Sequence, residues 1–166
     1  MQKINSSIKQ AAWQVPALAV LAFLTALFVN YWHPDSIPVV GDWSEESRFS
    51  DNSGESLVIS LEQAKLLFEQ NQAVFVDARP ESQYIEGHIH GALTIPWQDI
   101  DNYFNQAVQQ LENAGTIITY CDGETCELSH DLALFLKEMG FENVRVLVNG
   151  WSIWRMAGLS VQGDNL

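Results

Sequence analysis

One long apolar run dominates the N-terminal part of the chain. No residue between Lys9 and Asp35 is charged, and the stretch 11–32 consists mainly of Ala, Leu, Val and Phe. As a helix this stretch would extend roughly 33 Å, which matches the hydrocarbon core of a bilayer, about 30 Å thick. Trp13 and Trp32 stand near its two ends, where interfacial aromatic side chains are common. The pattern therefore predicts a single transmembrane helix over residues 11–32.

The residues that flank this run indicate how the helix is used. A cleaved signal peptide would need small residues after the apolar run, but the segment 29–33 is bulky. We therefore expect an uncleaved signal anchor. Lys3 and Lys9 lie in the N-terminal tail, residues 1–10, whereas the other flank is acidic. Because Lys and Arg stay in the cytoplasm, the domain is expected outside it, periplasmic or extracytoplasmic, on the inner (plasma) membrane.

Strand-like and helix-like patterns alternate in the rest of the chain. Residues 33–55 are rich in Pro, Gly, Ser and acidic residues without a sustained period, which predicts a linker before a domain at 56–166. Short apolar strands are expected at 73–77, 92–95, 116–120 and 144–148, and helical faces at 60–68, 97–111, 128–139 and 151–157. This alternation predicts an α/β domain with an open parallel sheet and helices on both faces. Functional residues in such sheets lie at the carboxyl ends of the strands, where Cys121 follows the third strand.

Composition and charge narrow the function classes. The 166 residues include 21 acidic and 8 basic side chains, for a formal net charge of −13. A nucleic-acid partner is excluded on this basis, because such binding depends on Lys and Arg that neutralise phosphates. With 2 cysteines, the chain is neither a disulfide-dense scaffold nor a four-cysteine zinc protein. Neither a cofactor nor a metal is expected.

Several short motifs of the domain, taken in order, resemble rhodanese-like (sulfurtransferase) domains. The first half of the resemblance is carried by Asp77-Ala78-Arg79, Tyr84, Glu86-Gly87-His88-Ile89-His90-Gly91-Ala92 and Ile95-Pro96. The second half is carried by Tyr120-Cys121, Gly140-Phe141, Val144, Leu147, Gly150 and Trp154. The resemblance covers about 56–161. It implies a compact α/β domain in which a loop cysteine, here Cys121, takes up sulfur from a donor as a persulfide. The sulfur then passes to an acceptor thiol or cyanide, and donor and acceptor are small molecules or proteins.

The position of Cys121 is chemically consistent with this role. The thiolate is the reactive form of cysteine, and its pKa is ordinarily near 8.5. A cysteine in a loop between a strand and a helix N-terminus faces backbone N–H groups and the positive end of the helix dipole. Both features favour the thiolate and would hold the outer sulfur of a persulfide.

The loop that follows is slightly longer than a common rhodanese loop and contains no base. It reads Cys121-Asp122-Gly123-Glu124-Thr125-Cys126-Glu127. Related phosphatases hold their phosphate with an arginine near the position of Glu127, so phosphatase activity is disfavoured. The acidic loop also disfavours a dianionic sulfur donor such as thiosulfate. We expect a neutral or monoanionic persulfide, or a partner protein with a basic patch.

Cys126 has two interpretations. It could be a resolving cysteine that forms a disulfide with Cys121, or a small residue that packs the loop against the next helix. A metal site formed by the two thiols and His130 would lack one ligand. Three further candidates, Asp77, Arg79 and His88, are expected to support the site: the first two as an ion pair and His88 as a hydrogen-bond partner that fixes its loop.

Two functions therefore remain open at this point. The first is a membrane-tethered sulfurtransferase that works through Cys121 and is held at the membrane by residues 11–32. The second is a non-catalytic or thiol-redox protein-binding module that uses the Cys121/Cys126 pair.

Overall fold

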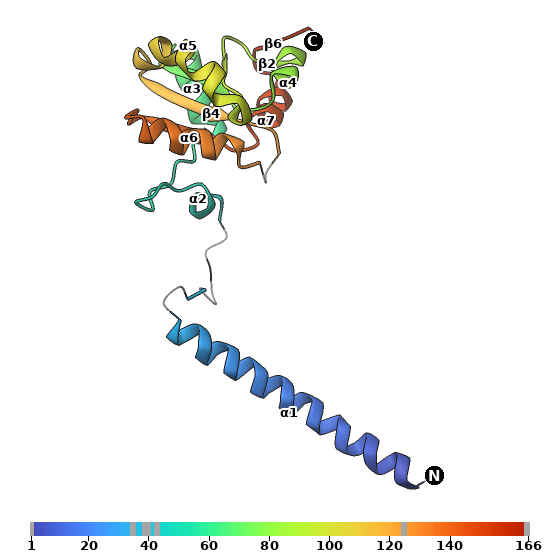
Figure 1. Cartoon of the computed structure of the whole chain (residues 1–166). Helices are drawn as coiled ribbons and strands as arrows, with labels where there is room; N and C mark the ends of the chain where they lie inside the picture. The colour runs from blue at the N-terminus through green and yellow to red at the C-terminus, as the bar shows by residue number, and fades with distance from the viewer. Residues whose placement is uncertain (1, 34–35, 38–40, 42–43, 124–125, 165–166) are drawn as a thin grey trace. The chain divides into compact units, whose positions relative to one another are not determined.

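The chain consists of an N-terminal helix and a folded domain. The structure, a computed structural model, describes residues 2–33, 36–37, 41, 44–123 and 126–164. It divides into two compact units, Met1–Asp42 and Trp43–Leu166. Figure 1 shows the helix of the first unit and the folded domain of the second.

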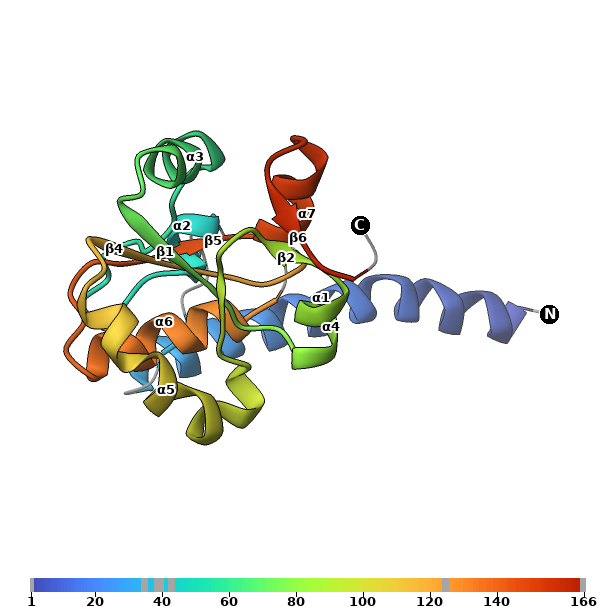
Figure 2. The ribbon, with the colours of Figure 1, turned by 90° about the horizontal axis from the view of Figure 1, so that it is seen from above.

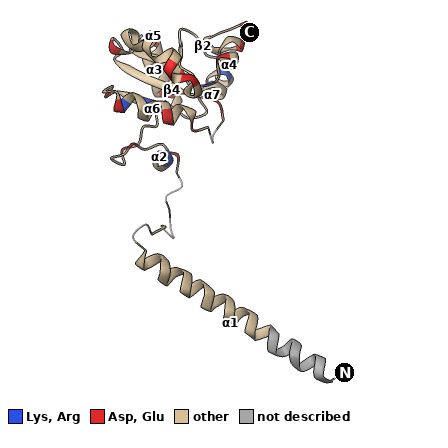
Figure 3. Cartoon of the chain, in the orientation of Figure 1, with Lys and Arg blue, Asp and Glu red and all other residues tan. Residues whose placement is uncertain are grey.

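The first unit is built on helix α1, Gln2–Trp32. Its segment Ala12–Trp32 has a mean hydropathy of 2.0 and is long and apolar enough to span a membrane. The described side chains of this helix include no Lys, Arg, Asp or Glu (Figure 3). The helix starts before the predicted span, because residues 2–10, expected as a tail, contain no Pro or Gly that would break it. In the last turn of this helix, the Asn30 side chain donates to the carbonyl of Ile37 and accepts from its backbone N–H.

The second unit is organised around a parallel sheet with the strand order β3-β1-β4-β5. The four strands are β1 (Ala73–Asp77), β3 (Leu93–Thr94), β4 (Thr116–Tyr120) and β5 (Val144–Leu147). A separate antiparallel pair joins β2 (His88–Ile89) to β6 (Val161–Gln162). The parallel sheet and its helices confirm the predicted α/β class.

Helices cover both faces of the sheet (Figure 2). One face carries α3 (Leu61–Glu69) and α7 (Gly150–Met156), and the other carries α5 (Ile100–Glu112) and α6 (Leu128–Glu138). The short helix α4 (Glu81–Glu86) and a 3-10 turn, Trp97–Asp99, lie in the connections around β2 and β3.

The apolar pattern of the strands explains the two layers. Adjacent residues of a strand point to opposite faces, so Phe75 packs with Trp154 on the α3/α7 side while Val76 joins Leu132 on the α5/α6 side. Both faces of the parallel strands are thus buried, as their near-continuous hydrophobic runs require. Ser60 and Gln63 form the predicted capping box at the start of α3.

The prediction of a linker over residues 33–55 is wrong for the second half of that range, which belongs to the folded domain. This half contains helix α2 (Glu45–Arg48). Phe49 follows the helix, is only 1% exposed and lies in the core on the α6 side of the sheet. The Phe49 ring packs edge-on against His130, with centroids 5.5 Å apart, and Asp51 pairs with Lys137 of α6 at 2.6 Å. Sequence periodicity missed this segment because a buried aromatic side chain and the ion pairs of Asp51 with Lys137 and of Glu55 with Arg145 anchor it, rather than a repeating apolar stripe.

The role of Phe49 can be measured by unfolding. We expect Phe49→Ala to lower the free energy of unfolding by about 3–5 kcal/mol, because it empties a fully buried aromatic site. Met156→Ala is the matched control, since Met156 is 84% exposed, and should change stability by no more than about 0.5 kcal/mol. Urea unfolding of the full chain in detergent, followed by near-UV circular dichroism, gives both values. Equal stabilities of the two variants would contradict the assignment of this segment to the domain.

Candidate active site

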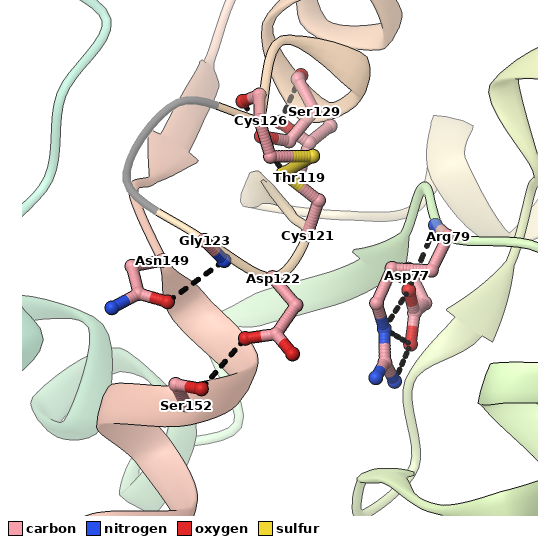
Figure 4. Close-up of a disulfide and its surroundings, with 10 residues drawn as sticks. All are labelled: Asp77, Arg79, Thr119, Cys121, Asp122, Gly123, Cys126, Ser129, Asn149 and Ser152. Atoms are coloured by element: carbon pink, nitrogen blue, oxygen red, sulfur yellow. Dashed lines mark hydrogen bonds and ion pairs between the residues drawn. A yellow bond between two sulfur atoms is a disulfide. The ribbon is translucent and has the colours of Figure 1, made fainter.

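The end of β4 delivers Cys121 into a loop that leads to α6. The cysteine is 1% exposed, and its carbonyl oxygen accepts a hydrogen bond from the backbone N–H of Trp151 at 3.1 Å. The Asp122 carboxylate accepts from the hydroxyl of Ser152 at 2.6 Å. The first residues of the loop are therefore held by the start of α7 (Figure 4).

A third contact comes from the turn between β5 and α7. Asn149 has a φ of 51°, in the left-handed region, and its side-chain oxygen accepts from the N–H of Gly123 at 2.9 Å. The next residue, Gly150, lies so close to β4 that an added Cβ would meet the Tyr120 Cβ at 2.6 Å. Glycine therefore permits the approach of α7 to β4 on which the three loop contacts depend.

The loop is closed by a disulfide between Cys121 and Cys126. The backbone N–H of Cys126 also donates to the carbonyl of Gly123 at 3.2 Å. Of the two interpretations of Cys126, the disulfide partner is the one present in this structure. Glu127 occupies the N-cap position of α6 without a side-chain capping bond. The remaining loop candidates, Glu124 and Thr125, lie outside the described residues.

Ser129 is a site residue that the sequence did not reveal. Its hydroxyl oxygen lies 3.2 Å from the Cys121 sulfur, in the first turn of α6, and its side chain is buried. Its carbonyl accepts a hydrogen bond from the hydroxyl of Thr119 at 2.8 Å, which ties α6 to β4. A serine in a helix carries no signal of this contact, because the loop geometry decides which residue of α6 faces the sulfur.

The predicted ion pair between Asp77 and Arg79 is confirmed. The two side chains lie at the end of β1, are nearly fully buried, and approach to 2.6 Å. Arg79 also donates to the carbonyl of Gly87 at 2.7 Å. Burial alone would lower the pKa of Arg79, but the hydrogen bond and charge of Asp77 outweigh it and raise that pKa. The neighbouring Tyr120 phenol has its pKa raised by burial and by the charge of Asp77.

His88 fixes its own segment, as expected. Its Nδ1 lies 2.7 Å from the carbonyl oxygen of Tyr84, and the two rings stack with centroids 3.7 Å apart. These contacts join α4 to β2. The contacts described for His88 do not reach the cysteine loop, so its place in the site is that of a support for the neighbouring chain.

A polar pocket of about 320 Å³ opens beside Asp122. Two guanidinium groups lie over the Trp151 ring there, with Arg79 at 4.7 Å and Arg155 at 5.7 Å from the ring centroid. Glu86 completes the charged lining. Arg79 and Arg155 come from other elements and lie beside Asp122. Arg79 is neutralised by its ion pair with Asp77, and Glu86 lines the same pocket, so the low use of a dianionic donor stays a prediction.

The described part of the site points to thiol chemistry. Within the described ranges, no group of three or more His, Cys, Asp and Glu side chains could hold a metal ion. Once the disulfide is reduced, the Cys121 sulfur would lie against the first turn of α6, beside the Ser129 hydroxyl. Hydrogen bonds and a helix N-terminus both stabilise a thiolate.

The buried ion pair generates a prediction about stability. We expect Asp77→Ala to lower the free energy of unfolding by about 3–5 kcal/mol, because it leaves the Arg79 charge buried without its partner. The double variant Asp77→Leu/Arg79→Met removes both charges and fills the site with apolar side chains. Its free energy of unfolding should fall by less than that of Asp77→Ala. Urea unfolding of the full chain measures both. A double variant less stable than Asp77→Ala would contradict the explanation that the unpaired Arg79 charge causes the loss of stability.

Comparison with known proteins identifies the domain. The sequence model of the Rhodanese-like domain family matches residues 60–157, more than half of the chain. The chain is 32% identical over 108 residues to the thiosulfate sulfurtransferase GlpE of Pseudomonas entomophila, covering 64% of this chain and 93% of that protein.

Two further proteins are similar. The HTH-type transcriptional regulator Rv0324 of Mycobacterium tuberculosis is 33% identical over 93 residues, or 56% of this chain. The chain spans only 39% of that regulator's length. The solution structure of the rhodanese-like domain of the Alr3790 protein from Anabaena sp. has a TM-score of 0.55 and 27% identity, covering 66% of this chain and 81% of that one. With the family match and the parallel sheet that ends at Cys121, the chain belongs to the rhodanese-like domain family.

Proposed function

We propose that this chain is a membrane-tethered sulfurtransferase that carries sulfur as a persulfide on Cys121. The observation that carries the proposal is the position of Cys121 in a rhodanese-like domain, after the central strand β4 and before α6. The similarity to a thiosulfate sulfurtransferase over 93% of that protein's length supports the same reaction class.

The reaction needs a free Cys121 thiolate. The thiolate attacks the outer sulfur of the donor, the donor's remaining group leaves with the electron pair, and Cys121 becomes a persulfide. An acceptor thiolate then attacks the outer sulfur and takes it, which regenerates the Cys121 thiolate. Ser129 would donate a hydrogen bond to the sulfur from 3.2 Å in these steps. The disulfide to Cys126 must be reduced before the cycle starts.

The second candidate is a thiol-redox or partner-binding module on the same fold. The disulfide between Cys121 and Cys126 favours it, because simple sulfur transfer requires a single cysteine. In this alternative the cysteine pair is a switch, and its oxidation state controls the shape of the loop that a partner protein contacts.

The tether is part of the proposal. The segment Ala12–Trp32 has the length and hydropathy of a membrane span. Lys3 and Lys9 on its N-terminal side and the acidic residues after it favour a signal anchor with the N-terminus in the cytoplasm. The domain would then work in the periplasm or another extracytoplasmic space, where disulfides persist.

Replacement of the cysteines separates the two candidate functions. We expect Cys121→Ser to abolish sulfur transfer, because no thiolate remains to accept the sulfur, while the fold is retained. Cys126→Ser should keep at least partial transfer. The measurement is the mass of the intact chain after incubation with a sulfur donor, with thermal unfolding as the folding control. The proposal requires one added sulfur on Cys121 of the Cys126→Ser variant; its absence there would favour the redox module.

The orientation is tested with a reporter fusion. Alkaline phosphatase fused after Leu166 should be active, because the enzyme matures only outside the cytoplasm, where its disulfides form. The control fusion carries Lys3→Glu and Lys9→Glu, which remove the positive side of the anchor and should lower reporter activity. An inactive wild-type fusion at normal expression would reverse the proposed orientation.

A further inference from the structure

The two cysteines of the disulfide differ in their access to solvent. Cys121 is 1% exposed, whereas Cys126 is partly exposed. The Cys121 sulfur also lies 3.3 Å from the carbonyl oxygen of Cys126 and 3.2 Å from the Ser129 hydroxyl. In this oxidised state Cys121 is therefore bonded and covered, and a sulfur donor cannot reach it.

We propose that Cys126 is a second catalytic cysteine, which resolves the Cys121 persulfide and releases its outer sulfur as hydrosulfide. The Cys126 thiolate attacks the Cys121 Sγ, and the bond between the two Sγ atoms forms. The bond from Cys121 Sγ to the outer sulfur breaks, and that sulfur leaves with the electron pair as HS⁻. The outer sulfur is reduced and the cysteine pair is oxidised to the disulfide. This inference rests on the proposed persulfide on Cys121.

The loop is built to bring Cys126 to the inner sulfur. Its first half is anchored on the β5–α7 turn and the start of α7 through the Cys121 carbonyl, Asp122 and Gly123. The Cys126 N–H donates to the Gly123 carbonyl, and the Cα atoms of the two cysteines lie 6.5 Å apart. This separation lies within the range that disulfides span. The atom that Cys126 reaches in the structure is the Cys121 Sγ, the inner sulfur of the proposed persulfide (Figure 4).

The unequal exposure of the two cysteines determines how the site is reset. A dithiol reductant of the thioredoxin class would attack at Cys126, the more exposed residue. Cys121 would then leave as a thiolate, with the Ser129 hydroxyl placed to donate a hydrogen bond to it. The second thiol of the reductant would free Cys126. Over one cycle, a donor's sulfane sulfur becomes hydrosulfide and the dithiol becomes a disulfide, so the chain would act as a persulfide reductase.

The test follows the outer sulfur. The reduced full chain in detergent, wild type or Cys126→Ser, is given glutathione persulfide without oxygen and then freed of excess donor. Alkylation and intact mass report persulfide and disulfide, and bimane trapping reports hydrosulfide. We expect the wild type to release one hydrosulfide for each disulfide formed. The Cys126→Ser variant should keep its persulfide and lose hydrosulfide release.

The outcomes separate this inference from the proposed function. If a persulfide forms on Cys121 in both proteins and lasts as long in the wild type as in Cys126→Ser, the resolving role of Cys126 is wrong and the proposed sulfur transfer stands. If no persulfide forms on folded Cys126→Ser, both proposals fall. If the variant does not fold, the ratio of hydrosulfide released to disulfide formed in the wild type decides the question by itself. Hydrosulfide release without disulfide formation would contradict the resolving role of Cys126.

A second measurement on the wild type tests the direction of reset. The oxidised chain is treated with limiting glutathione, and peptide mapping locates the mixed disulfide. The adduct should lie on Cys126, the more exposed cysteine. An adduct mainly on Cys121 would overturn the proposed order of attack.

Discussion

The parallel pairing of β1, β4 and β5 is the constraint on which the site depends. The register aligns Asp77 with Tyr120 and Tyr120 with Leu147, so the three strands end at one edge of the sheet. The residues that follow these ends are Ala78-Arg79, Cys121-Asp122 and Val148-Asn149. A shift of one strand by one residue would turn each of its side chains to the opposite face of the sheet and disrupt the packing of both layers. The same pairing that builds the core therefore fixes which polar groups surround the cysteine.

The close contact of α7 with β4 positions the cysteine loop at this edge of the sheet. Gly150 lies against Tyr120 because it has no side chain, and this approach lets the start of α7 bond the cysteine loop at three places. Tyr120 in turn accepts a hydrogen bond from the Ile89 N–H, which links β4 to the small β2–β6 pair. The first half of the loop is thus held by the fold, while Cys126 is held by its hydrogen bond to the Gly123 carbonyl and by the disulfide.

The charges that surround the pocket in space differ from those that neighbour Cys121 along the chain. The domain is strongly acidic, and the loop contributes carboxylates next to Cys121. Arg155 of α7 and Arg79 after β1 nevertheless line the pocket beside Asp122, and both guanidinium groups lie near the Trp151 ring. Net charge therefore describes the long-range field that a donor meets, whereas the local field depends on which elements the sheet brings together.

The sequence by itself determined the apolar helix, the order of the four parallel strands and of the helices that cover them, the ion pair at the end of β1 and the place of Cys121; it did not predict α2, α4 or the β2–β6 pair. The features that it determined depend on periodicity or on neighbours along the chain, such as Asp77 and Arg79 two residues apart. The tertiary structure decided the rest. Phe49 joins the buried core and packs against His130, Ser129 faces the sulfur because α6 starts where the loop places it, and Arg155 reaches the pocket from α7. Each of these pairs is distant in sequence or set by loop geometry, and no local pattern encodes such contacts.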